Sequence, residues 1–218
     1  DAFEGASAEV GGFLSVGSKA AAFGLMVRFV LGFDGEVPVL QSLSTFLGIG
    51  LGVMAVISMT FGNLAAYTQT NMKRLLAYST IAHAGYMLLA VSALLVTLNA
   101  PGGSGFNASE EAVHCVEGLT YYLAVYLFMN LTAFAVVALV RNETFSEEIS
   151  AYRGLISSGP TIKVLCVCLA LSFFSLVGLP PFGGFFAKVL IFMSAFKAGS
   201  IHWIMWVFVV IGGMNTAF

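Results

Sequence analysis

Four of the basic side chains within or beside the apolar stretches of this sequence are candidates for chemistry, because ionisable groups inside such stretches are costly and indicate function. Lys19, His83 and Lys188 fall inside such stretches, and Lys73 lies beside one. Each group binds and releases a proton, and histidine does so near physiological pH. The chemistry that this set supports is therefore proton transfer through an apolar region, with Lys19, His83 and Lys188 as the relay and Lys73 as a weaker candidate.

Each of these residues also has a structural interpretation. The ammonium groups of Lys19 and Lys188 could extend along the side chain to the membrane surface. His83 could serve only as a hydrogen-bonding residue of the core. Lys73, beside Arg74 in the predicted loop between the second and third apolar stretches, could anchor helix ends at the surface or take up protons.

The composition indicates an integral membrane protein. The chain has 218 residues, of which 59% are hydrophobic and 9% charged, against about 25% charged in soluble domains. A net charge of -2 argues against nucleic acid as a partner. The cysteines, Cys115, Cys166 and Cys168, have no Cys or His partners at metal-binding spacing, so no metal site is expected.

Six apolar segments predict an all-α membrane protein, a polytopic helical bundle forming a single transmembrane domain over residues 1–218. None of them alternates in the way that a barrel strand does. The predicted helical segments are approximately 11–32, 39–67, 75–98, 116–140, 162–197 and 201–218.

The fifth segment is predicted to be a discontinuous helix, broken at 178–184 by the sequence GLPPFGG. Proline lacks the amide hydrogen that a helix needs, and glycine allows backbone angles that a helix does not use. The runs on either side each cover more than half of an apolar core about 30 Å thick, at about 1.5 Å per residue. The break therefore lies inside the membrane, with Lys188 in the first turn after it. Broken helices build ion sites near the membrane midplane in transporters.

The charges between the segments predict the orientation of the chain. The side that holds residue 1 also holds Lys73, Arg74, Arg141, Arg153 and Lys163, whereas the other side holds Arg28 and Lys197. Basic residues are enriched in cytoplasmic loops. The residue-1 side is therefore predicted to be cytoplasmic.

Two long stretches carry a resemblance to a known family. FGNLAAYTQTNMKRLLAYSTIAHAGYMLLA at 61–90 and VGLPPFGGFFAKVLIFMSAF at 177–196 closely resemble the antiporter-like membrane subunits of respiratory complex I, NADH-quinone oxidoreductase. The opening 3–24 is similar to the loop that leads into the eighth helix of that family. Within the family, QTNMKRLLAYSTIAHAGY most resembles the N-type subunit, called subunit 2 in mitochondria.

The resemblance implies a fourteen-helix antiporter-like fold, of which this chain would be a fragment holding the eighth to thirteenth helices. It implies that Lys19 bridges two half-channels and that Lys188 ends the outlet half-channel. This chain would hold no cofactor, and NADH, FMN, iron–sulfur clusters and quinone would belong to other subunits. The implied partners are the other membrane subunits of complex I, the lipid bilayer and protons, with a bacterial inner membrane as the expected location.

The resemblance therefore implies a proton-translocating subunit coupled to quinone reduction elsewhere in the complex. Two alternatives share the same fold: a subunit of a multisubunit cation/proton antiporter, and a structural paralogue that conducts no protons.

Overall fold

The apolar stretches form α-helices, because a helix pairs its interior backbone N–H and C=O groups within itself. The structure is a computed structural model that describes residues 5–33, 38–98, 110–157 and 159–216. Five helices among these residues are long and apolar enough to cross a membrane, which confirms the predicted fold class. The helices are α2 (Ala8–Leu31), α3 (Pro38–Tyr67), α4 (Met72–Thr97), α5 (Glu110–Thr144), α6 (Pro160–Val177), α7 (Gly183–Ala198) and α8 (Ile204–Thr216), with two 3-10 turns, η1 (Ile149–Tyr152) and η2 (Leu155–Ser157).

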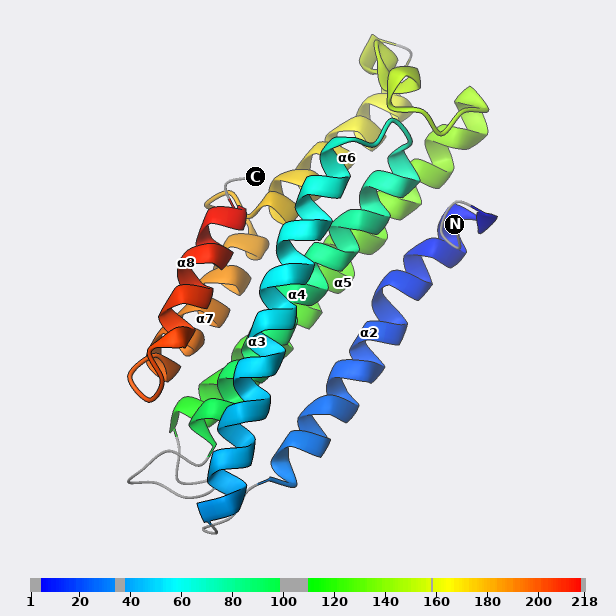
Figure 1. Ribbon diagram of the computed structural model, residues 1–218. Helices are drawn as coiled ribbons and strands as arrows, with labels where there is room; N and C mark the ends of the chain where they lie inside the picture. Colours follow the sequence, from blue (N-terminus) through cyan, green and yellow to red (C-terminus); the bar gives the residue numbers. More distant parts are fainter. Residues whose placement is uncertain (1–4, 34–37, 99–109, 158, 217–218) are drawn as a thin grey trace.

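Helix α4 lies at the centre of the bundle. It packs against α2, α3, α5, α7 and α8, and its side chains are buried over most of its length. Helices α2 and α8 lie on opposite sides of the bundle (Figure 1). Side chains that α4 presents to its neighbours are therefore held away from lipid.

Glycines let the backbones of α3 and α4 come into direct contact. A Cβ atom added to Gly62 would lie 2.6 Å from the backbone nitrogen of Ala82, and one added to Gly85 would lie 2.8 Å from the carbonyl oxygen of Ala55. Such close approach between small residues is a common basis of helix packing in membranes. Contacts on both sides of His83 thus fix this part of α4 against α3.

The predicted break in the fifth segment is confirmed. Helix α6 ends at Val177 and α7 begins at Gly183, with a cis peptide bond between Pro180 and Pro181. Gly178 adopts the left-handed conformation at φ 84°, which glycine allows at no steric cost. Because α7 begins at Gly183, Lys188 lies in its second turn, and the prediction of the first turn is wrong.

The prediction that Lys73 and Arg74 lie in a loop is also wrong. The Asn71 side-chain oxygen accepts hydrogen bonds from their backbone nitrogens, at 2.9 and 3.2 Å, and both residues lie in the first turn of α4. Asparagine is a favoured N-cap, so the helix begins at Met72 instead of 75.

Polar helix ends extend other segments beyond their apolar runs. Helix α5 covers Glu110–Thr144, longer than the predicted 116–140, and has acidic residues in its first turn. Acidic side chains stabilise that end of a helix. The last predicted segment, 201–218, includes residues 217–218, which lie outside the described residues.

Replacing Gly62 by alanine tests the close packing of α3 on α4. The added Cβ would meet the backbone of Ala82, and overpacking costs about 1–3 kcal/mol. We expect a lower thermal unfolding midpoint for Gly62→Ala in detergent. Gly50→Ala on the same helix is the control, because nothing lies within 4 Å of its added Cβ. Equal midpoints for the two variants would contradict the packing.

Candidate proton-transfer site

The break between α6 and α7 provides an acceptor for the ammonium group of Lys188. The Lys188 Nζ donates a hydrogen bond of 2.9 Å to the carbonyl oxygen of Val177, the last residue of α6. The last four carbonyls of a helix have no partner within the helix and carry negative partial charge. The side chain is 7% exposed, so the ammonium lies inside the bundle and bonds to the end of the broken helix.

A hydrogen bond between α6 and α7 and the absence of a side chain at Gly178 allow this geometry. The backbone nitrogen of Gly184, at the start of α7, donates a 3.2 Å hydrogen bond to the Ser175 hydroxyl of α6. A Cβ atom at Gly178 would lie 3.2 Å from Cδ of Lys188, closer than ordinary van der Waals contact. Each half of the broken helix therefore pairs backbone groups of the other, and glycine at 178 leaves space for the lysine.

His83 lies in the buried middle of α4. Its Nδ1 is 2.6 Å from the hydroxyl oxygen of Tyr122 on α5, and the residue is 4% exposed. Its ring centroid lies 5.2 Å from that of Tyr126 and 6.1 Å from that of Tyr86. The imidazole is thus surrounded by three tyrosines, one of which it pairs with directly.

Lys19 reaches the same group of tyrosines from α2. Its Nζ donates to the carbonyl oxygen of Thr80 at 2.7 Å and to the hydroxyl of Tyr126 at 3.4 Å. The side chain therefore points into the bundle, toward α4 and α5.

The tyrosines join the three predicted residues into one line. Tyr126 contacts both Lys19 and His83, while the Tyr86 ring, which neighbours His83, has the Nζ of Lys188 4.9 Å from its centroid. The line runs from Lys19 through His83 to Lys188. Sequence reasoning missed the tyrosines, because aromatic residues in an apolar helix are ordinary packing residues. Tyr122 and Tyr126 are one helical turn apart and share a face, which was the available signal.

A cavity of about 510 Å³ adjoins this line. It extends along α4 from Met72 to Tyr86, and it is bounded by residues of α3, α6, α7 and α8. The polar side chains in its lining are those of Asn63, Tyr67, Gln69, Ser79, His83, Tyr86, Lys188, Asn215 and Thr216. It thus connects His83 and Lys188 with the end of the bundle where α4 begins.

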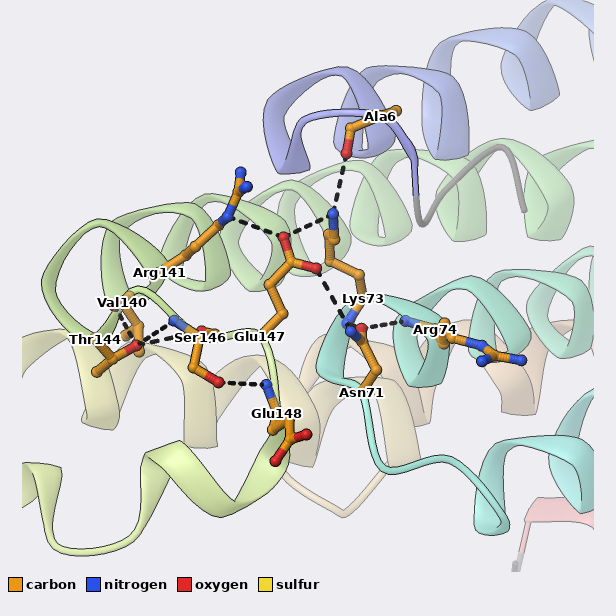
Figure 2. Close-up of polar contacts among 10 residues, drawn as sticks. All are labelled: Ala6, Asn71, Lys73, Arg74, Val140, Arg141, Thr144, Ser146, Glu147 and Glu148. Carbon is orange, nitrogen blue, oxygen red and sulfur yellow. Dashed lines mark hydrogen bonds and ion pairs between the residues drawn. The ribbon is translucent and has the colours of Figure 1, made fainter.

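The fourth candidate, Lys73, lies apart from this line in an ionic cluster at that end (Figure 2). Its Nζ is 2.7 Å from Oε1 of Glu147, which is also 3.0 Å from Nε of Arg141, and it donates to the carbonyl oxygen of Ala6 at 3.1 Å. Lys73 is 3% exposed. Glu147, which lies outside the apolar segments, thus neutralises Lys73, which is buried at the start of α4.

The same cluster fastens the segment after α5 to the start of α4. The backbone nitrogen of Met72 donates to the carbonyl of Glu147, and that of Ile149 donates to Thr70, both at 2.9 Å. Ile149 lines the cavity together with Met72. Burial and the nearby carboxylate of Glu147 raise the pKa of Tyr152, in η1, to about 12. This segment therefore borders the cavity and is held there by ion pairs and backbone hydrogen bonds.

The described residues include no group of three or more His, Cys, Asp or Glu side chains that could hold a metal ion. Cys115, Cys166 and Cys168 are free thiols. The buried polar groups of the site are instead proton-binding side chains and hydroxyls.

A broken helix and a buried line of basic and phenolic side chains characterise this chain, which is a polytopic helical membrane protein. A family model described as NADH:quinone oxidoreductase/Mrp antiporter, TM, matches residues 1–216, and the chain belongs to this family. NADH-quinone oxidoreductase subunit N of Anaeromyxobacter sp. (strain Fw109-5) is 42% identical over all of this chain and 40% of its own length. The resemblance to N-type subunits is thereby confirmed. The chain spans about two fifths of the length of the curated relatives it matches.

Solved structures agree with this membership. A chain of respiratory complex I from Thermus thermophilus with bound aureothin is 34% identical, with a TM-score of 0.57 over 77% of this chain and 32% of that chain. A chain of the membrane-bound sulfane sulfur reductase, an archaeal respiratory membrane complex, has a TM-score of 0.71 over 98% of this chain and 39% of its own. That second chain is 21% identical and supports the fold alone.

Replacing Glu147 by glutamine tests the ionic cluster. Removing one partner of a buried ion pair costs up to about 3–5 kcal/mol, because a charge stays buried without compensation. We expect Glu147→Gln to lower the thermal midpoint and to speed trypsin cleavage after Arg153. Glu148→Gln is the matched control, since Glu148 is exposed and lies outside the ion pairs. The same cleavage rate in both variants would show that the ion pairs do not hold this segment.

Proposed function

We propose that this chain is a proton-translocating membrane component of an NADH-quinone oxidoreductase, with Lys19, His83 and Lys188 as the proton relay. One observation carries the proposal: His83 lies between the tyrosine that contacts Lys19 and the tyrosine that contacts Lys188, inside a membrane bundle. Ionisable groups at such depth are rare, and proton relays are among their known uses.

Transfer along this line would combine direct hydrogen bonds with water. The bonds from Lys19 to Tyr126 and between His83 and Tyr122 are direct. The cavity borders both His83 and Lys188, and its volume of about 510 Å³ leaves room for several waters beside the polar side chains of its lining. The Tyr86 hydroxyl is buried beside the Asn63 amide, and both residues line the cavity. Water in the cavity would connect the histidine with the lysine past this hydroxyl.

The position of the cavity indicates the side of the membrane with which Lys188 would exchange protons. It extends from Lys188 toward Tyr67 and Gln69, at the end of the bundle that also holds Ala6. The resemblance implies that Lys188 ends the outlet half-channel. The cavity supports proton exchange between Lys188 and the residue-1 side, which loop charge predicts to be cytoplasmic.

Lys73 is better assigned to structure than to proton uptake. Its ammonium pairs with the Glu147 carboxylate, which Arg141 also contacts, and donates to the carbonyl of Ala6. These contacts lie apart from the line of tyrosines, and they hold the segment after α5 beside the cavity.

The oxidation chemistry would take place in other subunits. NADH, FMN, iron–sulfur clusters and quinone would be held there, and electron transfer would drive the relay in this chain through contacts with neighbouring membrane subunits. Bacterial relatives that are themselves quinone oxidoreductase subunits support a bacterial inner membrane as the location.

Co-purification separates this proposal from its two alternatives. Affinity purification of the whole subunit from native membranes should bring flavin and iron–sulfur subunits with it. Recovery with antiporter subunits alone would support cation/proton exchange instead. A structural paralogue would co-purify with the redox subunits but would lose no proton transport when its lysines are replaced.

Replacing Lys188 by methionine tests the relay. Methionine keeps the length and apolar body of lysine and removes the proton site. We expect the complex to assemble and its proton pumping to fall to below about one hundredth of the wild-type rate, the scale on which positioned proton-transfer groups act. The measurement is acidification of the proteoliposome interior while the complex oxidises NADH with quinone.

Lys197→Met is the matched control, because Lys197 lies on the same helix and is exposed. Its pumping should equal that of the wild type. An assembled Lys188→Met complex that pumps at the wild-type rate would contradict the assignment.

A further inference from the structure

Helices α2 and α5 meet along a ladder of three matched contacts. Lys19 donates to the Tyr126 hydroxyl, and one turn away the Asn130 amide donates to the Ser15 hydroxyl. Ser15 and Lys19 are four residues apart on α2, as are Tyr126 and Asn130 on α5, so each pair lies on one face of its helix. The two helices are antiparallel at this contact, and the second bond repeats the register of the first.

The third contact is a close approach at Gly12. A Cβ atom there would lie 3.1 Å from Cβ of Phe134, so glycine lets the backbones come near enough for a short serine side chain to span the gap. The Ser15 hydroxyl donates to the Gly12 carbonyl at 2.6 Å, which turns its oxygen lone pairs toward the Asn130 amide. The order along the interface is thus Gly12 with Phe134, Ser15 with Asn130, and Lys19 with Tyr126.

The buried amide of Asn130 depends on its hydrogen bond to Ser15. Ser15 and Asn130 are both 0% exposed, and the Asn130 Oδ1 accepts no hydrogen bond from the described residues. The bond to Ser15 is therefore the polar contact that this amide makes with another helix. A buried amide with neither end paired would carry a desolvation penalty.

Besides this ladder, the polar contacts that fix α2 are the bond from Lys19 to the Thr80 carbonyl and, just before the helix, that from Lys73 to the Ala6 carbonyl. Several of its large apolar side chains, including Phe13, Leu25 and Phe29, are exposed on the surface that would face lipid. Apolar contacts of that kind do not distinguish one register from another. A shift of one residue would move α2 by about 1.5 Å and turn it by about 100°, which would take Lys19 away from Tyr126.

We propose that Ser15 and Asn130 are positioning residues for the proton-transfer step at Lys19. Their hydrogen bond fixes the rotation and height of α2 on α5, and so holds the Lys19 ammonium on the Tyr126 hydroxyl. This inference rests on the proposed function, since it assigns the residues a role in the same relay.

The test measures coupled quinone reduction and proton pumping in the assembled complex that contains the full subunit. Asn130→Leu removes the amide at similar volume, and we expect pumping to fall at least several-fold at an unchanged amount of complex. Ser15→Ala removes a single oxygen and should act in the same direction, which keeps the test available if Asn130→Leu lowers assembly. Thr132→Val is the control, because Thr132 is exposed on the same helix and its hydroxyl donates to the Phe128 carbonyl of that helix.

A second measurement separates positioning from general packing. If Asn130 acts through Lys19, Asn130→Leu should not lower the residual quinone reduction rate of a Lys19→Met complex any further. The exchange of the pair, Ser15→Asn with Asn130→Ser, should restore pumping, because it restores the hydrogen bond.

The outcomes distinguish this inference from the proposed function. Wild-type pumping by Lys19→Met would overturn the proposed role of Lys19, and the inference with it. Loss of pumping in Lys19→Met together with wild-type pumping in Asn130→Leu and Ser15→Ala would overturn the inference alone. An equal further loss from Asn130→Leu in both backgrounds would also overturn it, because the asparagine would then act independently of the lysine.

Discussion

The hydrogen bond between the Lys188 ammonium and the Val177 carbonyl is the contact on which the interior of the bundle depends. An ammonium in an apolar interior needs a partner with negative charge or partial charge. A continuous helix would use the Val177 carbonyl within its own backbone, whereas the break at Gly178 frees it. The discontinuity is therefore the feature that allows a lysine to lie at this depth.

The remaining groups are held by the packing of α4. Close contacts at Gly62 and Gly85 hold this helix against α3 on both sides of His83. Helix α5 brings Tyr122 and Tyr126 next to the imidazole, and α2 brings Lys19 to Tyr126. The closely packed part of the site is thus a contact among four helices, α2, α3, α4 and α5, while the broken helix and the cavity form its more open side.

The sequence was sufficient to predict the residues whose placement is costly. Lys19, His83 and Lys188 stand out because charge in hydrocarbon is unfavourable, and the break stands out because two prolines cannot continue a helix. The position of Lys73 was mispredicted, since an apolar run marks where hydrocarbon begins and not where Asn71 caps the helix. Its partner Glu147 lies 74 residues further along the chain, and only the fold brings the two together. The cavity could not be predicted either, because side chains from five helices and η1 form it.

The central claim is that His83 carries protons between the two lysines, beyond its hydrogen bond to Tyr122. His83→Gln separates these roles, because glutamine has a similar reach and both donates and accepts hydrogen bonds, but does not titrate. The measurement is proton pumping per NADH oxidised by the assembled His83→Gln complex in proteoliposomes. The relay predicts that the complex assembles and that this ratio falls well below that of the wild type. A wild-type ratio would contradict the account and leave His83 as a hydrogen-bonding residue of the core.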